Sequence, residues 1–238
     1  LWAAKLFLNT LKARGITVDG DARTRDAREP IADRFEPQRA RELTFVSSQP
    51  LREIIKATNK GSINLYAELI LRTLGRERAG MLPAHEPGSR ERGDDEAGLA
   101  IIRLWLNSSK APLQGVALHD GSGLSRLNLV MPRTLVQLLA AMQRSPNSQI
   151  FRESLPLSGR DGTLGSRLKE YADRVSAKTG YLTYDTALSG FVTTSEGEVL
   201  AFSVICNDET ERASSGRLID QIVSRLAAYP SRISEKPQ

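Results

Sequence analysis

The sequence predicts an α+β fold, in which helices pack against an antiparallel sheet. Helical periodicity runs through the middle of the chain, whereas residues 178–194 and 198–206 alternate like strands and flank the short turn SEGE. The last segment, residues 208–229, is again an amphipathic helix. Because the apolar face of such a sheet must be covered, we expect the terminal helices of the chain to pack on it.

The first 47 residues add a helix and two short strands to this prediction. LWAAKLFLNTLKARG (1–15) has apolar residues at helical spacing and ends at Gly15. The runs ITVDG (16–20) and ELTFV (42–46) are typical of short strands, with a polar loop between them. The sequence starts inside a helix and without Met, so we expect it to be part of a longer protein.

Four further helices are predicted in the middle of the chain. Ser48 is placed to cap the first of them, and Gly75 is placed to end the second. Since strands are predicted near both ends of the chain, we expect the sheet to bring these ends together. The helices cover about residues 48–59, 62–75, 96–109 and 131–145; a helical subdomain then covers about 48–175, and a sheet subdomain about 1–47 and 176–238.

Composition excludes several classes of function. The net charge is +5 and the pI is near 9.5, but basic and acidic residues are interspersed without a dense basic run, so we expect no nucleic-acid partner. No run approaches the roughly 20 apolar residues of a membrane span, and the chain does not open with a signal-peptide pattern.

The cysteine and histidine content argues against disulfide and metal chemistry. Cys206 is the single cysteine, so no intrachain disulfide can form, and its apolar setting favours a small buried side chain over a reactive thiol. His85 and His119 are far apart and lack the HExxH spacing of zinc enzymes. We therefore expect no zinc site.

The triplet Lys178-Thr179-Gly180 opens the strand-like segment. A Lys ammonium and a Thr hydroxyl on a strand edge can bind a carboxylate, and Gly lets a substrate backbone approach closely. The backbone N–H of Tyr181 could then point at a developing oxyanion. Taken alone, the triplet also suits an exposed edge strand that a lysine protects from pairing.

A second triplet, Ser62-Ile63-Asn64, lies between a Gly-ended segment and a helix. Its Ser could relay a proton while its Asn, two residues on, holds a substrate amide in the same cleft. The alternative is that Ser62 is simply the N-cap of the following helix. From the triplet alone, both interpretations stay open.

The glycine-rich stretch HDGSGLSR contains a further candidate serine, Ser122. A nucleophile elbow needs Gly two residues before the Ser, and Asp120 stands there instead. We therefore interpret Asp120 and Ser122 as parts of a hydrogen-bonded turn that lines the cleft.

Together these phrases carry a resemblance. SIN and KTG look like the second and third motifs of the penicillin-recognising serine enzymes. HDGSGLSR, DGTLGSRL before AKTGYL, and LSGFVTTSEGEVLAFSVICN extend the match along essentially the whole chain. The chain resembles the D-alanyl-D-alanine carboxypeptidase/endopeptidase family, the class C low-molecular-mass penicillin-binding proteins of peptidase family S13. The resemblance implies a β-lactamase/transpeptidase-like fold with a helical subdomain.

The chain departs from the family pattern at three points. The first motif, a Ser-x-x-Lys that carries the acylated Ser, is missing, and we interpret the only in-register candidate, Ser166 to Lys169, as a decoy. Ile63 stands where Asp is usual, and Tyr181 stands where a small residue is commoner. The bulky Tyr ring could narrow the site or face outward.

The resemblance also implies an activity for the complete protein, a serine-type peptidase acting on peptidoglycan peptides that end in D-Ala-D-Ala. In this scheme Ser62 relays a proton, Asn64 binds the peptide amide, and Lys178 with Thr179 holds the terminal carboxylate, beside Gly180 and Tyr181. β-Lactams would acylate the same missing Ser, no cofactor takes part, and the protein acts in the periplasm or cell envelope. The isolated chain, without the nucleophile, is expected to be inactive. Two alternatives remain open: a non-catalytic peptidoglycan-binding module and a β-lactamase.

Overall fold

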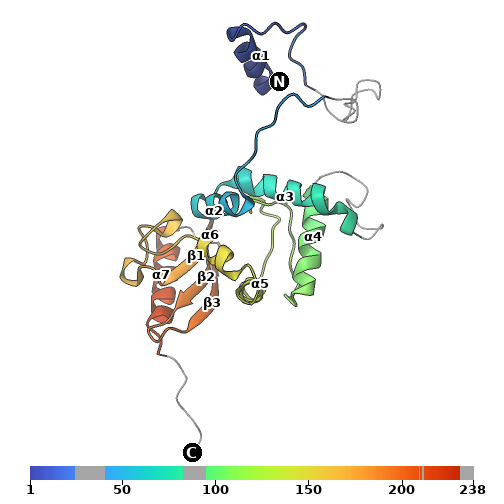
Figure 1. The fold of residues 1–238 in the computed structure, drawn as a ribbon. Helices are drawn as coiled ribbons and strands as arrows, with labels where there is room; N and C mark the ends of the chain where they lie inside the picture. Colours follow the sequence, from blue (N-terminus) through green and yellow to red (C-terminus); the bar gives the residue numbers. More distant parts are fainter. Residues whose placement is uncertain (25–40, 83–94, 209, 211, 231–238) are drawn as a thin grey trace, which may run out of the picture. The chain divides into compact units, whose positions relative to one another are not determined.

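The computed structural model describes residues 1–24, 41–82, 95–208, 210 and 212–230. The chain divides into two compact units, Leu1–Ser48 and Gln49–Gln238, and each is described by itself (Figure 1). The sequence-based division into a helical and a sheet subdomain stays a prediction.

The first unit contains helix α1, Trp2–Ala13, which confirms the predicted opening helix. The strands predicted at residues 16–20 and 42–46 were wrong, because the structure gives both runs as irregular backbone outside any strand. Their apolar side chains are solvent-exposed, with Val46 95 % exposed. A strand is stabilised by a hydrogen-bonded neighbour and a buried face, and within this unit the described residues supply neither.

Helices build most of the second unit up to residue 154 and confirm the four predicted segments. The first begins after Pro50 rather than at Ser48, because Pro50 occupies the N-cap position. The second continues past Gly75, which is buried inside the helix and does not end it. Their bounds are α2 Leu51–Gly61, α3 Asn64–Arg78, η3 Ala79–Met81, α4 Asp95–Ser108, α5 Pro132–Gln143 and α6 Ser148–Ser154.

Three antiparallel strands follow, in the order β1-β2-β3: β1 Val175–Leu182, β2 Asp185–Thr193 and β3 Val199–Cys206. The segment 178–194, predicted as one strand, is therefore a hairpin that turns at Thr183 and Tyr184. The turn was missed because it lacks the usual Gly; Tyr184 itself takes a left-handed φ of 68°. The turn predicted at SEGE, residues 195–198, is confirmed and joins β2 to β3, with Gly197 at φ 87°.

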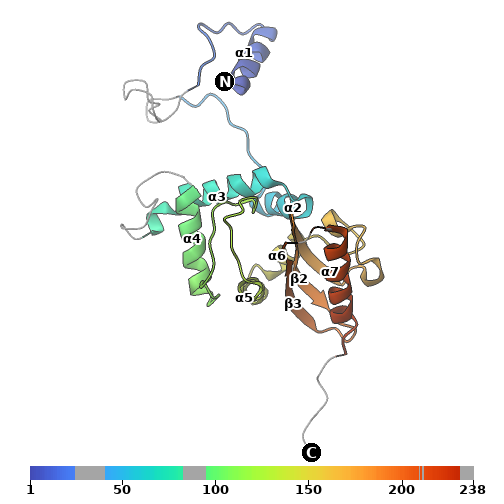
Figure 2. The same cartoon turned by 180° about the vertical axis from the view of Figure 1, so that it is seen from behind.

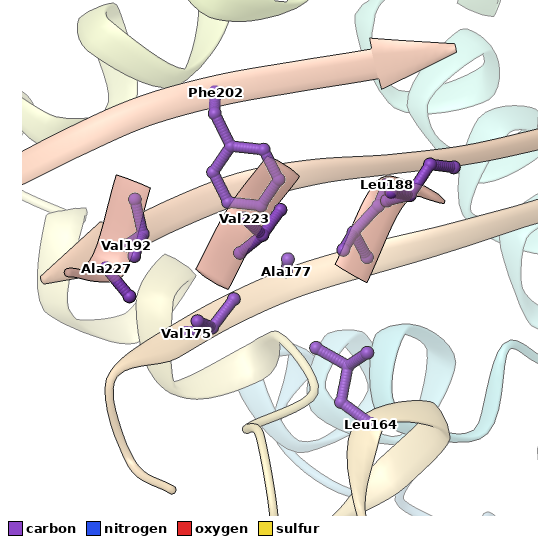
Figure 3. Close-up of a cluster of buried hydrophobic side chains, with 9 residues drawn as sticks. Leu164, Val175, Ala177, Leu188, Val192, Phe202, Val223 and Ala227 are labelled. Carbon is purple, nitrogen blue, oxygen red and sulfur yellow. The ribbon is translucent and has the colours of Figure 1, made fainter. Parts of the chain in front are cut away.

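Both faces of this sheet are buried. Helix α7, Arg212–Ala227, covers one face, as expected of the C-terminal helix, and α5 and α6 lie on the other (Figures 1 and 2). Figure 3 shows the α7 side, where Val175, Ala177 and Leu188 point at the helix. Each fully buried aliphatic side chain contributes about 1.5–3 kcal/mol of burial free energy. The remaining members of this cluster are Leu164, Val192, Phe202, Ile219, Val223 and Ala227.

The opposite face is centred on Phe191, which packs with Leu139 and Leu155 and meets the ring of Phe151 edge-on at 6.3 Å. Cys206 ends β3 and is half-buried against the α7 cluster, consistent with its interpretation as a packing residue. Because Val175 and Ala177 of β1 are fully buried in the α7 cluster, the side chains near the end of this strand have a fixed position.

We predict that Gly190→Ala destabilises the chain by about 2–4 kcal/mol, since an added methyl group cannot be accommodated. A Cβ at Gly190 would lie 2.2 Å from the carbonyl oxygen of Ser176 and 2.5 Å from Cα of Ala177, both backbone atoms of β1. Urea unfolding measures the change. Gly216→Ala in α7 is the matched control: its Cβ meets nothing within 4 Å, and helix propensity should make it stabilising by about 0.5–1 kcal/mol. Equal effects at both positions would contradict the packing argument.

Candidate active site

The structure brings Ser62 and Lys178 together from positions 116 residues apart. Lys178 Nζ donates to Ser62 Oγ at 2.8 Å and to the carbonyl oxygen of Thr179 at 2.8 Å. Ser62 follows α2 as its C-cap residue, with φ 52° and ψ 50°, and Ile63 is the N-cap of α3. The interpretation of Ser62 as an N-cap is therefore wrong, and its hydroxyl contacts the KTG lysine instead.

Burial changes the pKa of Lys178. The side chain is half-buried, and desolvation lowers its pKa below that of a free lysine. A partly desolvated ammonium bonded to a hydroxyl can supply a proton through it, and it attracts a carboxylate more strongly than a hydrated lysine would.

Asn64 is the first residue of α3 and is exposed, two residues after Ser62. Ile63, where the related motif has Asp, turns back toward the end of α2: a Cβ on Gly61 would lie 3.2 Å from its Cγ1. The Ile side chain thus packs locally, which leaves Ser62 and Asn64 as the polar residues of this triplet.

Thr179 is buried, whereas Gly180 is partly exposed. Thr179 is 6 % exposed, and its hydroxyl donates to Thr163 Oγ1 at 2.9 Å, in the short helix η4, Gly162–Leu164. The hydroxyl is therefore held by the loop before β1, and its proposed contact with a carboxylate stays a prediction. Gly180 faces Ala187 across the hairpin, where an added Cβ would lie 3.4 Å from the Ala methyl group.

The ring of Tyr181 is held at its phenol end. Arg167 Nη1 donates to Tyr181 Oη at 2.7 Å, and the same guanidinium pairs with Asp220 of α7 at 2.7 Å. This contact ties the ring to α7. The ring therefore lies on the α7 side of the sheet, opposite the face that carries Lys178. Sequence reasoning did not single out Arg167, because nothing local indicates a partner 53 residues away.

The backbone N–H and C=O groups of β1 point alternately toward β2 and away from it, as in any antiparallel ladder. Ala177 N–H donates to Pro156 O at 3.0 Å, and Val175 O accepts from Ser158 N–H at 2.9 Å, so both groups point away from β2. By the same alternation, the N–H of Tyr181 is directed to that edge of the sheet. The direction agrees with its predicted role toward an oxyanion.

Asp120 organises the glycine-rich turn. It accepts hydrogen bonds from Gly123 N–H at 2.8 Å, Ser125 N–H at 2.6 Å and Asn128 Nδ2 at 2.8 Å. Burial opposes ionisation of Asp120, but these hydrogen bonds outweigh it and hold its pKa below the ordinary value. The Ser122 hydroxyl accepts a long bond, 3.4 Å, from Leu124 N–H and also bonds to the Asp120 carboxylate. Both residues have the structural setting expected of a turn.

The turn is attached at two places. Glu68 of α3 accepts the N–H groups of Gly121 and Ser122, at 3.2 and 2.9 Å. Arg126 donates to Thr183 O at 2.5 Å and lies 3.4 Å from Asp185, in the β1–β2 hairpin. Glu68 and Arg126 could not be assigned from the sequence, because their partners are distant along the chain.

Ser166 and Lys169 do not share a regular helical turn. Ser166 is exposed in a turn, Lys169 begins the short helix η5, Lys169–Tyr171, and Leu168 between them has a left-handed φ of 51°. A nucleophilic Ser-x-x-Lys needs both side chains on one helix face, and this geometry does not provide it.

Among the described residues, no three His, Cys, Asp or Glu side chains cluster in a way that could hold a metal ion. His119 lies in the described part of the chain, and His85 lies outside it. A search of the same described residues finds no helix with the length and apolar character needed to cross a bilayer.

Solved structures define the class of protein to which this fold belongs. Penicillin-binding protein 4 of Haemophilus influenzae, in complex with a β-lactam, matches with a TM-score of 0.77 and 26 % identity, over 95 % of this chain and 51 % of that chain. The TLA-3 extended-spectrum β-lactamase matches in fold, with a TM-score of 0.53 and 18 % identity over 76 % of this chain and 66 % of that chain. The fold is thus β-lactamase-like, as the resemblance implied.

The sequence comparison then gives the family. Residues 1–229 match the D-Ala-D-Ala carboxypeptidase 3 (S13) family. The chain belongs to this family of serine peptidases. A D-alanyl-D-alanine carboxypeptidase of Actinomadura sp. (strain R39) is 35 % identical over 234 residues, which are 95 % of this chain and 40 % of the relative. The chain therefore spans well under half the length of this relative.

We predict that Asp120→Ala destabilises the second unit by about 1–3 kcal/mol at neutral pH, because three exposed or partly buried donors of the turn lose their charged acceptor. The contribution of a carboxylate with a lowered pKa is present above its unfolded pKa and is lost as pH falls through the folded value. The gap in unfolding free energy between wild type and Asp120→Asn should accordingly shrink in acid. Urea unfolding from pH 7 down to pH 3 tests this, and a gap that widens in acid would contradict it.

Proposed function

We propose that this chain supplies one wall of the active site of a serine-type D-alanyl-D-alanine carboxypeptidase/endopeptidase that acts on peptidoglycan stem peptides. The observation that carries the proposal is the hydrogen bond between Lys178 Nζ and Ser62 Oγ, which unites two polar motifs in the fold of an acyl-transfer family. The names of the related carboxypeptidases support the reaction, and the β-lactam complex of the related penicillin-binding protein supports β-lactam binding.

In the proposed reaction, a serine nucleophile attacks the carbonyl carbon between the two terminal D-alanines. We place this serine and its lysine base, the Ser-x-x-Lys motif of the family, outside this chain. The serine proton passes to the lysine base, the C–N bond breaks, the acyl group stays on the serine, and D-Ala leaves as an amine after taking a proton through Ser62. Water then attacks the ester and releases the shortened peptide, which restores the serine.

The residues of this chain assist each step. Ser62, polarised by Lys178, relays a proton to the departing amine nitrogen. Lys178 attracts the terminal carboxylate, with Thr179 beside it, and Asn64 binds the peptide amide. The Tyr181 N–H stabilises the oxyanion at the edge of β1, where Gly180 allows the substrate backbone to approach. β-Lactams would enter the same cleft and acylate the same serine.

By family membership we further propose that the protein acts in the periplasm or cell envelope, where peptidoglycan lies. A non-catalytic peptidoglycan-binding module remains the second candidate. Such a module would need a cationic side chain to bind the carboxylate but no proton relay, so the close contact of Ser62 with Lys178 favours the enzyme.

The first functional test replaces the relay serine. In the product of the complete reading frame, Ser62→Ala should lower kcat for release of D-Ala from a stem peptide by about 10²- to 10⁴-fold, because the leaving amine loses its proton source. Ser166→Ala, the control, should leave kcat near the wild-type value. Fluorescent-penicillin labelling with mass spectrometry locates the acylated residue. Labelling at Ser166 would contradict the assignment, and a wild type without labelling or turnover would favour the binding module.

The second test concerns pH. Lys178 must be protonated to attract the carboxylate, and burial lowers its pKa. As pH rises, kcat/KM should therefore fall at a pH below that at which a free lysine titrates. Lys178→Arg keeps its charge throughout this range, so its residual activity should lack the fall. A basic limb that persists unchanged in Lys178→Arg would assign it to another group.

A further inference from the structure

An ion pair outside the proposed catalytic set joins the end of α2 to the loop before β1. Lys60 Nζ donates to both carboxylate oxygens of Asp161, at 2.7 and 2.6 Å, and to the carbonyl oxygen of Leu155 at 3.0 Å. The Lys60 side chain is only 18 % exposed. A poorly hydrated charge with three acceptors favours this one geometry, because a displacement would leave it unpaired.

The pair connects the two partners of the candidate site by a second route. Lys60 stands two residues before Ser62 on one side. On the other side, Asp161 Oδ1 accepts the N–H of Leu157 at 3.0 Å, and Leu157 forms an antiparallel bridge with Ser176. Ser176 in turn stands two residues before Lys178. The ion pair thus closes a ring of contacts around the Ser62–Lys178 hydrogen bond.

The same junction is tightly packed. Asn59 Nδ2 donates to Ser154 Oγ at 2.8 Å, which holds the last turn of α2 against the end of α6. Gly162, at φ 58°, approaches so closely that an added Cβ would lie 2.9 Å from the carbonyl oxygen of Lys60. The last turn of α2 has little room to shift while the ion pair is intact.

We propose that Lys60 and Asp161 are positioning residues that hold the Ser62 hydroxyl against the Lys178 ammonium. The inference rests on the proposed function, since it concerns the proton relay of that site. Neither residue contacts the proposed substrate groups; both act through the backbone segments that carry Ser62 and Lys178.

The pair also places two opposite charges in the segments that lead to Ser62 and Lys178. A cavity of about 360 Å³ lies beside it and carries charges from α2, α6 and the segment before β1. Loss of the Lys60 charge would leave the Asp161 anion, which favours the charged form of Lys178. Loss of the Asp161 charge would leave the Lys60 cation, which disfavours it. The other charged residues that line this cavity are Lys56, Arg152, Glu153, Asp173 and Arg174.

The test uses the product of the complete reading frame with Lys60→Met, Asp161→Asn and the double variant. Each single variant should lower kcat by about 10- to 100-fold, as expected for a misplaced relay, with a smaller change in KM. The basic limb of kcat/KM should move to higher pH in Lys60→Met and to lower pH in Asp161→Asn. In the double variant it should return toward the wild-type position.

The matched control is the neighbouring pair of Arg160 and Asp173, which is joined at 2.6 Å but is 64 % and 45 % exposed. Arg160→Met removes one cation from this loop without touching α2, and it should leave kcat and the pH profile near wild type. Effects equal to those of Lys60→Met would show a general response to lost charge and overturn the proposal.

Stability is measured on the same samples by thermal unfolding. Folded variants with wild-type kcat, or with basic limbs that move in the same direction, would overturn the positioning role. Lys60→Arg keeps the charge and should recover part of kcat, so it still tests the proposal if Lys60→Met does not fold. A folded Lys60→Arg as slow as Lys60→Met would also overturn the role. An inactive wild type would instead overturn the proposed function itself.

Discussion

Burial of both faces of the three-stranded sheet is the constraint on which the rest of the second unit depends. Side chains of β1 alternate between the α7 core, which takes Val175 and Ala177, and the opposite face, which takes Ser176 and Lys178. A slip of one residue would force the lysine ammonium into the apolar cluster under α7, at a cost of several kcal/mol. The register of the sheet therefore fixes the face on which Lys178 stands.

Polar pairs then attach the surrounding loops to this fixed sheet, and they differ in strength. The pair of Arg126 and Asp185 is 56 % and 30 % exposed and should contribute little, whereas that of Arg167 and Asp220 is 16 % and 28 % exposed. The better buried pair anchors Arg167, which bonds Tyr181 of β1, and the weaker pair lies at the tip of the hairpin. The edge of β1 is thus held more firmly than the loop beside it.

The sequence predicted those parts of the fold that local periodicity encodes: helices α2 to α5, the strand-rich end and the covering helix α7. It failed where a tertiary partner decides the outcome. Residues 42–46 have the composition of a strand but no described neighbour to pair with, and Tyr184 adopts a left-handed turn that glycine usually signals.

The candidate site shows the same division. Both triplets could be recognised because their residue types suit the chemistry, and the family phrases placed them in context. Their contact, 116 residues apart, and the bond of the Thr179 hydroxyl to Thr163 could not be predicted, since no local pattern specifies the partner of a side chain. Lys60 and Asp161 look like ordinary surface residues until the structure shows them as a half-buried pair.

The left-handed backbone of Ser62 has a consequence for the history of the protein. For a residue with a side chain, this conformation costs about 1–2 kcal/mol that glycine would not incur. A sequence selected for stability alone would drift toward glycine at this junction of two helices. The serine therefore lowers the free energy of unfolding, and mutations elsewhere that stabilise the fold would be needed to compensate for it.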